Sequence, residues 1–305
     1  MHPIIVHADM AIWRTCILAI RLTLGGAAAC VGGMHAACGA DTAAAVPRII
    51  SLSPHITELL FAAGAGGRVV GVDDSSDYPA AVAGIVRVGE PSALDVEGLL
   101  KLKPTLIVLW ESGTPARRKA ELERLNLSLY VTDQHRLDDI GATLLDFGRL
   151  AGTEQAAAVA AQGYRSELAQ LRAQYAARPR LKVFYQVWDR PLYTLSGTHV
   201  VTEVLSLCGG ENVFADLLTL APEIDKESVI ARNPDVILVA ATGAQGARQT
   251  LEWNRFSNLR AVRDHHVFTV DPSLVGRMAP RILQGIREVC TVLDRAREPA
   301  PRGNP

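Results

Sequence analysis

The sequence has no excess of charge of either sign. Its 305 residues include 31 lysines and arginines against 32 aspartates and glutamates, which gives a formal net charge of −1. A protein whose main partner is nucleic acid presents a basic surface to the phosphates, so this balance argues against such a partner. With 49% hydrophobic and 21% charged residues, the chain has an ordinary globular composition and is long enough for two domains with their own cores.

The sequence also lacks the short motifs of common hydrolases, metalloproteases and nucleotide-binding proteins. It contains no Gly-x-Ser-x-Gly, no His-Glu-x-x-His and no Walker loop. The glycine-rich run Gly64–Gly67 follows a predicted helix and precedes the predicted strand Val69–Val72. A dinucleotide-binding fingerprint has the reverse order, so we predict a turn there. Nothing in the sequence requires catalysis, and we do not expect an enzyme.

No apolar run is long enough to span a bilayer. The stretch Leu22–Met34 is too short for that and follows Arg14 and Arg21, as in a signal peptide. The small residues Ala43–Ala45 suit a signal peptidase. We therefore expect residues 1–45 to be a cleaved signal peptide and the protein to be exported to the periplasm.

Cysteine is scarce outside this leader. Of five cysteines, only Cys208 and Cys290 lie beyond residue 45. An even pair in an exported chain favours a disulfide, and two separate buried thiols are the alternative. No second cysteine or histidine stands at ligand spacing near either one, so no metal site is predicted. Within the leader, Cys30 and Cys38 each follow two alanines, which makes a lipid anchor the alternative to cleavage.

The longest predicted helix covers residues 154–176. It has no proline and one glycine, and its larger apolar residues recur at i, i+4, i+7 and i+11. At 1.5 Å per residue it would be about 34 Å long, roughly the width of a small domain.

The segments on either side of this helix share a pattern. Thr57-Glu58 with Gly64 matches Thr202-Glu203 with Gly209, and the same order of Asp, Glu and Pro recurs at positions 95, 97 and 104 and at positions 225, 227 and 234. Two matches in the same order indicate two lobes of like fold, with a ligand cleft between them. We expect lobes at 46–152 and 178–297, a connecting helix at 153–177 and a disordered tail at 298–305.

Strands alternate with helices in both halves. This alternation is typical of an α/β fold with parallel or mixed sheets and helices on both faces. The predicted strands cover residues 48–52, 69–72, 106–110, 125–132, 181–188, 236–240 and 266–270. The main predicted helices cover residues 57–63, 96–103, 137–150, 202–208 and 281–295, with a further helix between Asp225 and Pro234.

Glu97 and Glu227 occupy equivalent positions in the two halves. Each is expected near the first turn of a helix, where a carboxylate gains up to about 1 kcal/mol from the helix dipole. This interaction with the helix dipole is enough to explain a glutamate at either position taken alone. Their occurrence in both halves favours a symmetric grip on a two-fold partner that presents arginines.

Two tryptophans are predicted to wall the cleft. Trp110 and Trp188 are expected to end equivalent strands, where α/β sheets face their ligands, and would suit a large flat molecule. A lone tryptophan is more often part of a core. His55 either ligates a metal in a bound cofactor or makes local hydrogen bonds. Other loop residues expected at the same cleft are Asp77, Tyr78, Tyr193, Asp271 and Arg277.

Several short motifs in combination resemble the periplasmic cobalamin-binding proteins, which are substrate-binding components of ABC importers within a larger group that binds siderophores and haem. The resemblance runs from about residue 47 to residue 293. Its motifs are Arg48-Ile-Ile-Ser-Leu-Ser-Pro54, Thr57-Glu58, Gly71-Val72, Ser76-Asp77-Tyr78-Pro79, Lys103-Pro104, Cys208-Gly-Gly-Glu-Asn-Val-Phe214 and Pro280-Arg281.

This resemblance implies a class III periplasmic binding protein, with two Rossmann-like lobes joined by a single long rigid helix. It implies that Glu97 and Glu227 dock on arginines of a membrane permease, which works with an ATPase at the inner membrane. It further implies a disulfide between Cys208 and Cys290, pocket positions at Trp110 and Arg277, and a monomer that holds cobalamin as transported ligand rather than as cofactor.

The sequence departs from this family at the pocket. Relatives often have aromatic residues where Ser75, Pro91 and Ala221 align, and we expect Tyr78, Trp188 and Tyr193 to compensate. A corrinoid remains the leading ligand. The alternatives are haem, with Tyr78 or His55 as axial ligand, and a ferric siderophore. The remaining alternative is an exported α/β enzyme that uses Asp77, Asp271 and His55.

Overall fold

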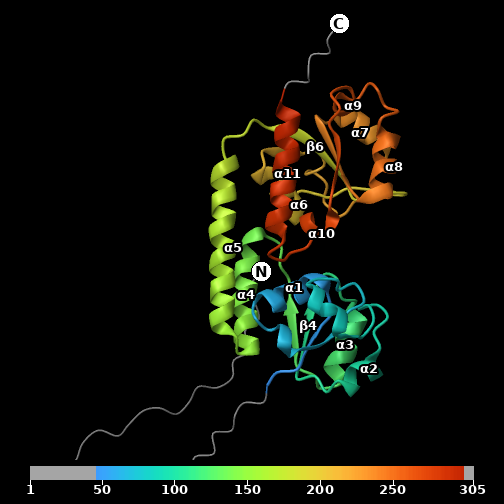
Figure 1. Ribbon diagram of the computed structural model, residues 1–305. Coiled ribbons are helices and arrows are strands. Elements are labelled where there is room, and N and C mark those ends of the chain that lie inside the picture. The colour runs from blue at the N-terminus through green and yellow to red at the C-terminus, as the bar shows by residue number, and fades with distance from the viewer. Residues whose placement is uncertain (1–45, 299–305) are drawn as a thin grey trace, which may run out of the picture. The chain divides into compact units, whose positions relative to one another are not determined.

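Two parallel β-sheets, each with helices on its faces, are connected by one long helix (Figure 1). The computed structural model describes residues 46–298. The predicted signal peptide, the alternative anchor sites Cys30 and Cys38, and residues 299–305 of the predicted tail lie outside the described residues. Among the helices described, none is long and apolar enough to cross a membrane.

The N-terminal lobe is built on a five-stranded parallel sheet in the order β3-β2-β1-β4-β5. Its strands are β1 (Ile49–Ser51), β2 (Val69–Val72), β3 (Val86–Arg87), β4 (Leu106–Trp110) and β5 (Leu129–Thr132). Its α-helices are α1 (Pro54–Ala62), α2 (Val96–Lys101), α3 (Ala116–Arg124) and α4 (Leu137–Ala151). The glycine-rich run after α1 passes through a short 3-10 turn, η1 (Gly66–Arg68), and a second such turn, η2, covers Ala80–Gly84.

The C-terminal lobe is built on a four-stranded parallel sheet in the order β11-β10-β6-β9. Its strands are β6 (Leu181–Gln186), β9 (Gly210–Asn212), β10 (Val236–Ala240) and β11 (Val267–Val270). Its helices are α6 (Val200–Leu207), α7 (Lys226–Arg232), α8 (Gly243–Trp253), α9 (Arg260–Arg263), α10 (Pro272–Val275) and α11 (Ile282–Arg297). A separate antiparallel hairpin, β7 (Trp188–Asp189) with β8 (Leu192–Tyr193), is inserted between β6 and α6.

The two lobes repeat one topology, as the sequence pattern predicts. The order β2-β1-β4-β5 in one sheet corresponds to β9-β6-β10-β11 in the other. The shared Asp-x-Glu motif begins α2 and α7, where Asp95 accepts a hydrogen bond from Gly98 N at 2.9 Å and Asp225 accepts one from Ser228 N at 2.7 Å. These are N-caps, which satisfy backbone donors that the helix leaves unpaired. The two-lobed α/β fold is confirmed.

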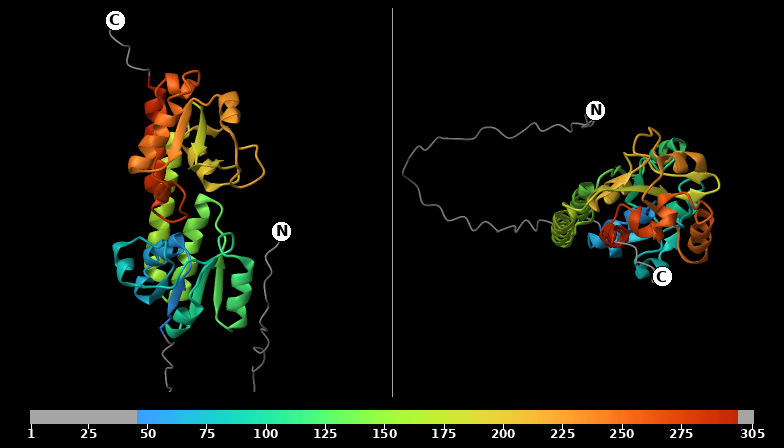
Figure 2. Two further views of the ribbon diagram at one scale, coloured as in Figure 1. Left: turned by 90° about the vertical axis from the view of Figure 1, so that its right-hand side faces the viewer. Right: turned by 90° about the horizontal axis from the view of Figure 1, so that it is seen from above.

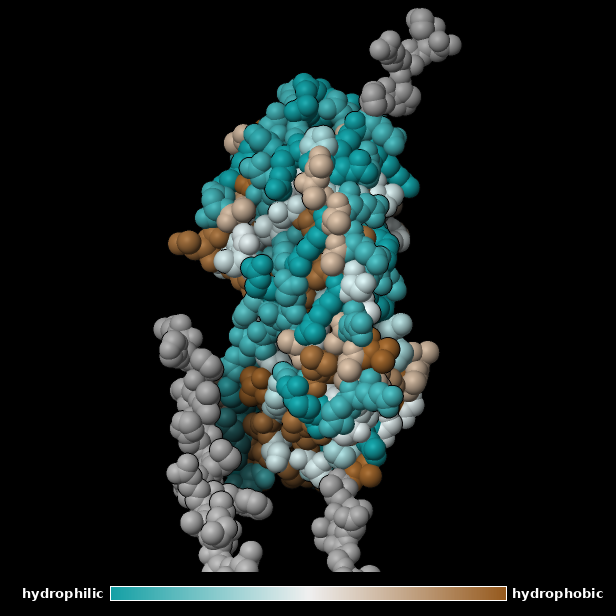
Figure 3. All heavy atoms as spheres, turned by 90° about the vertical axis from the view of Figure 1, so that its left-hand side faces the viewer, coloured by the Kyte–Doolittle hydropathy of each residue, from teal (hydrophilic) through white to brown (hydrophobic). Residues whose placement is uncertain are grey.

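The connecting helix α5 (Glu154–Tyr175) buries one stripe of residues, including Tyr164, Leu168, Leu171 and Tyr175. It packs along α4 and also contacts α1, α6 and α11. The largest hydrophobic cluster therefore contains residues of both sheets, such as Ile49 of β1 and Val183 of β6, together with this stripe. Figure 3 views the side that α5 occupies, where hydrophilic residues cover most of the upper half.

Two smaller clusters fill the other face of each sheet. One lies between the N-terminal sheet and helices α2 and α3, and the other between the C-terminal sheet and helices α7, α8 and α9. The sequence did not predict α3 and α8, because both are rich in polar residues and neither has a side-chain cap. Each is a helix mainly because its few apolar side chains, such as Leu122 and Trp253, dock in these clusters.

A disulfide joins Cys208, at the end of α6, to Cys290 in α11. Both residues are fully buried. The pairing that the sequence favours is confirmed, and it links α6 to α11, the last helix described. Figure 2 shows this C-terminal helix, in red, within the C-terminal lobe.

Replacing both cysteines by alanine is expected to lower the free energy of unfolding by about 2–5 kcal/mol, because the link constrains an unfolded segment in which the two residues are 82 positions apart. Urea unfolding under oxidising conditions, followed by circular dichroism, measures the difference. An unchanged midpoint and slope in the Cys208→Ala/Cys290→Ala variant would contradict this expectation.

Candidate functional site

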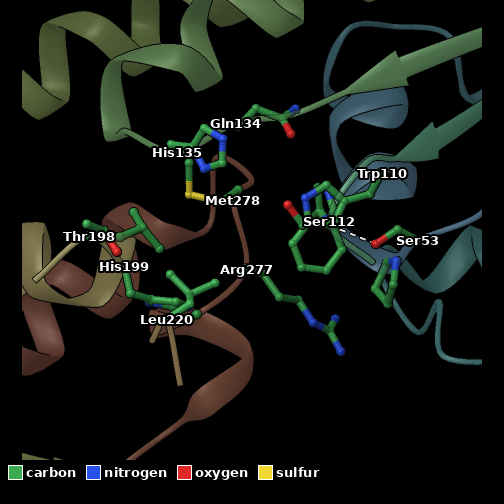
Figure 4. Close-up of a pocket in the computed structure, with 14 residues that line it drawn as sticks. Ser53, Trp110, Ser112, Gln134, His135, Thr198, His199, Leu220, Arg277 and Met278 are labelled. Atoms are coloured by element: carbon green, nitrogen blue, oxygen red, sulfur yellow. Dashed lines mark hydrogen bonds between the residues drawn. The ribbon is translucent and has the colours of Figure 1, made fainter. Parts of the chain in front are cut away.

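A cavity of about 260 Å³ lies between the two lobes, where the carboxyl ends of their strands face each other (Figure 4). Parallel sheets place their ligands at this edge, because the loops that follow the strands converge there. The N-terminal lobe contributes Ser53, Pro54, His55, Trp110, Ser112, Gln134 and His135. The C-terminal lobe contributes Thr198, His199, Val200, Leu220, Gly276, Arg277 and Met278.

Trp110 forms the aromatic wall of the cavity. It is the last residue of β4, so its backbone is fixed by the sheet while its ring is only partly buried. The ring meets that of His55 edge to face, with 5.3 Å between centroids and an interplanar angle of 87°. Trp110 therefore presents a held but accessible aromatic surface, as the sequence predicts for this position.

His55 follows β1 and sits behind this wall. Its Nδ1 lies 2.7 Å from Ser53 Oγ, and its buried Nε2 has no hydrogen-bond partner among the described residues. Burial, with a smaller contribution from the charge of Arg277, lowers the pKa of His55 to about 4. The imidazole is therefore neutral at physiological pH, with one nitrogen uncommitted.

A hydroxyl network beneath His55 fixes the loops after β1 and β2. Thr57 Oγ1 donates to Ser51 Oγ at 2.8 Å and lies 2.7 Å from Ser76 Oγ, which in turn donates to Asp73. Burial raises the pKa of Asp73 to about 6. These bonds connect the loops that follow the neighbouring strands β1 and β2, next to the segment that brings His55 to the cavity.

His199 provides a polar group on the opposite wall. It is the N-cap of α6, and its Nδ1 accepts a hydrogen bond from Val201 N at 3.1 Å. Burial lowers the pKa of His199 to about 4, so the ring is neutral and its proton resides on Nε2. His199 is thus a hydrogen-bond donor of fixed tautomer at the cavity, beside the apolar side chains of Leu220 and Met278.

Arg277 lies at the edge of the cavity and bridges the lobes. Its guanidinium donates to Asp77 at 2.5 and 3.2 Å and to Glu58 at 3.2 Å. The hydrogen bond from Arg277 lowers the pKa of Asp77 below its usual range. Among the described residues, Arg277 is the only lysine or arginine that lines the cavity. The carboxylates of Asp77 and Glu58 already pair with its charge.

Tyr78 lies outside this cavity. Its ring is 3.8 Å from the guanidinium carbon of Arg281, a cation–π contact, and it is 42% exposed. It lines a neighbouring pocket of about 300 Å³ with Phe61 and Pro280. Seven residues were predicted to bind the ligand, and three of them, His55, Trp110 and Arg277, line the cavity. Asp77 does not line it but accepts hydrogen bonds from Arg277, which does.

Trp188 and Tyr193 lie in the β7–β8 hairpin and not among the residues that line the cavity. The Trp188 ring is half exposed, and its Nε1 donates to Arg190 O at 3.1 Å. The prediction that Trp110 and Trp188 end equivalent strands is wrong. The counterpart of β4 is β10, which ends at Ala240, whereas Trp188 follows the counterpart of β1 and is carried away by the inserted hairpin. A ligand contact for either hairpin residue stays a prediction.

Glu97 and Glu227 are exposed in the first turns of α2 and α7. Both helices lie on the side of the described unit away from α5 (Figure 1). Glu97 forms a surface ion pair with Lys101 at 2.8 Å. Asp271, a further predicted cleft residue, instead caps α10 through a bond from Ser273 N at 2.8 Å.

Sequence reasoning missed most of the C-terminal wall of the cavity and also His135 and Gln134. For His199 a signal existed: a polar side chain directly before the apolar start of a helix is typical of an N-cap. For the other residues the sequence held no local signal of a ligand site, because they meet only where the two lobes face each other. Within residues 46–298, no cluster of three or more His, Cys, Asp or Glu side chains is arranged to hold a metal ion.

Comparison with known proteins points to one family. The family described as periplasmic binding protein matches residues 49–274. The vitamin B12-binding protein of Vibrio cholerae serotype O1 is 35% identical over 246 residues, which cover 81% of this chain and 88% of that protein. The vitamin B12-binding protein of Yersinia pestis is 35% identical over 248 residues, covering 81% and 86%.

Solved structures agree with this result. The periplasmic vitamin B12-binding protein of Vibrio cholerae has a TM-score of 0.78 at 34% identity, covering 83% of this chain and 98% of that chain. A periplasmic haem-binding protein from Roseiflexus sp. RS-1 in its apo form has a TM-score of 0.74 at 26% identity, covering 83% and 99%.

Burial of His55 is expected to make stability depend on pH. Its pKa is about 4 in the folded protein against an ordinary value of 6.5, so between these values the unfolded chain binds more protons than the folded one. The free energy of unfolding therefore rises with pH across this window, by at most about 3 kcal/mol from this residue. Urea unfolding of wild type and His55→Gln at pH 4.5 and pH 7 isolates the effect. The stability of wild type relative to the variant should fall at the lower pH, and a constant difference would refute the assignment.

Proposed function

Since the chain belongs to the periplasmic binding protein family, we propose that it is an exported binding protein that captures cobalamin or a related corrinoid between its lobes and delivers it to an ABC importer. The observation that carries the proposal is the interlobe cavity walled by Trp110, in a chain that matches nearly the full length of vitamin B12-binding proteins.

The chemistry of the cavity supports a corrinoid. This ligand class has an extended macrocycle whose edge bears amide side chains. Trp110 offers an aromatic surface, and His199 offers a neutral N–H donor that suits an amide oxygen. Pockets that enclose small ligands measure about 300–1,000 Å³, and this cavity measures about 260 Å³. A corrinoid would therefore fill the cavity only in part and would also extend along the cleft between the lobes. Cobalamin is the transported cargo in this proposal, and no cofactor is required.

Haem is the second candidate, because of His55. A neutral imidazole with an uncommitted, buried nitrogen is a suitable iron ligand, and one structural relative is a haem-binding protein. Haem also carries two carboxylates that need cations, and the one arginine at the described cavity is already paired with Asp77 and Glu58. Because no unpaired cation is available for the haem carboxylates at the described cavity, the uncharged amide edge of a corrinoid fits this cavity better than haem does.

Delivery to a permease assigns a role to Glu97 and Glu227. Both are exposed, sit at equivalent places in the two lobes and lie away from α5. In this proposal each carboxylate pairs with an arginine of the membrane permease, which works with its ATPase at the inner membrane. The protein would act in the periplasm as a monomer.

Titration with cyanocobalamin, followed by calorimetry and absorbance, is expected to give one saturable site at micromolar concentration or below. Trp110→Ala should weaken binding by about 10-fold or more, since burying a large apolar side chain against the ligand is worth about 1.5–3 kcal/mol. Trp188→Ala is the matched comparison and should weaken binding less, because Trp188 lies outside the cavity.

The absence of saturable binding by the wild-type protein would overturn the corrinoid proposal. Addition of haemin under the same conditions tests the rival. A shifted Soret band that disappears in His55→Gln would support haem as the ligand.

Reversing both docking charges, in Glu97→Arg/Glu227→Arg, is expected to abolish uptake of the ligand by cells that express the importer. Affinity for the ligand should stay within about twofold of wild type, because both side chains are exposed and neither lines the cavity. Normal uptake in the double variant would contradict the docking assignment. Lost uptake with lost affinity would point to misfolding instead.

A further inference from the structure

The Thr-Glu pairs at positions 57–58 and 202–203 do not line the cavity. In each pair, however, the glutamate forms hydrogen bonds to the opposite lobe. Glu58, on α1 of the N-terminal lobe, is almost fully buried. It accepts two hydrogen bonds from Arg281, at 2.9 and 2.6 Å, and one from Arg277 at 3.2 Å. Arg281 is the N-cap of α11, the last helix of the C-terminal lobe.

Glu203, on α6 of the C-terminal lobe, reaches the matching place in the N-terminal lobe. Its Oε2 accepts a hydrogen bond at 2.9 Å from the backbone N of Leu137, the first residue of α4. Its Oε1 lies 3.0 Å from Arg172 of α5 and 3.9 Å from Arg136, the N-cap of α4. In the repeated topology α4 and α11 both come after the edge strands, β5 and β11, so each glutamate contacts the start of the corresponding helix of the other lobe.

The two threonines hold the same helices to their own lobes. Thr57 Oγ1 bonds to Ser51 Oγ at 2.8 Å, and Thr202 Oγ1 donates to Ser196 O at 2.8 Å. Each Thr-Glu pair thus bonds α1 or α6 to its own lobe through the threonine and to the opposite lobe through the glutamate. A lobe movement that separates Glu58 from Arg281, or Glu203 from the start of α4, breaks charge-assisted hydrogen bonds.

We infer that Glu58 and Glu203 form a paired interlobe clamp that sets the width of the cavity and the rate at which ligand leaves. Glu58 is in addition a positioning residue for Arg277, which lines the cavity and shares its guanidinium between Glu58 and Asp77. Without Glu58, two guanidinium groups on the C-terminal lobe lose their shared buried partner. The inference about ligand release rests on the proposed function, whereas the clamp itself does not.

The test compares Glu58→Gln, Glu203→Gln and the control Glu121→Gln, whose ion pair with Arg118 lies within α3 of one lobe. Each clamp variant is expected to raise the dissociation rate of bound cyanocobalamin by about tenfold while the association rate changes by less than about threefold. Small-angle scattering of the ligand-free protein should give a larger radius of gyration for the clamp variants than for wild type and the control.

Scattering and hydrogen exchange at the start of α4 and α11 report on the clamp even if the wild-type protein binds no corrinoid, so failure of the ligand proposal is distinguishable. Glu203→Gln, at the less buried site, keeps the test available if Glu58→Gln does not fold. Dissociation rates, radii and exchange equal to those of Glu121→Gln would overturn the clamp. A conservative Glu203→Asp variant should restore part of the wild-type dissociation rate.

Discussion

The buried stripe of α5 is the constraint on which the rest of the structure depends. One helix supplies apolar side chains to a core that both sheets share, with Ile49 of β1 and Val183 of β6 in the same cluster. Burial of each large apolar side chain contributes about 1.5–3 kcal/mol, so pulling the lobes away from α5 would expose several such contacts at once. This shared core therefore opposes any full separation of the two lobes.

Charge is arranged so that the cavity itself is nearly neutral. Burial keeps His55 and His199 uncharged, and Arg277 is matched by Asp77 and Glu58. An anionic ligand would have to displace a carboxylate from Arg277, which costs the charge-assisted bonds already formed. A large ligand with amide groups meets an aromatic wall and neutral donors without that cost, and this is the physical reason to favour a corrinoid over haem.

Local signals made much of the fold predictable. The N-caps Asp95 and Asp225, the apolar spacing of α5 and the repeated Thr-Glu and Asp-x-Glu motifs each depend on residues close together in the chain, and each is found as expected. Helices α3 and α8 were missed because their sequences are polar and their formation depends on docking. The placement of Trp188 failed because a hairpin insertion breaks the correspondence between strands.

The site was less predictable, because its contacts join distant parts of the chain. Trp110 was predicted from its place at the end of a strand and Arg277 from a loop at the cleft, and the resemblance implied both. The bond between Arg277 and Glu58, in contrast, spans 219 positions and has no local pattern. His199 was missed for a different reason. Its N-cap role concerns only its own helix, and its significance appears only when the opposite lobe closes the cavity around it.

The two lobes contain two pairs of glutamates at equivalent positions, and the two pairs have opposite surroundings. Glu58 and Glu203 turn inward and are held by arginines of this chain, and Glu58 is 2% exposed at its side chain in a bidentate pair. Glu97 is 81% exposed, and its pair with Lys101 is a surface ion pair that contributes about 0–1 kcal/mol. An exposed carboxylate of this kind exchanges its lysine for an arginine of another protein at little cost, whereas Glu58 cannot do so without unpairing two partly buried cations, Arg277 and Arg281. Solvent exposure therefore separates the two glutamates proposed to clamp the lobes from the two proposed to dock on a permease.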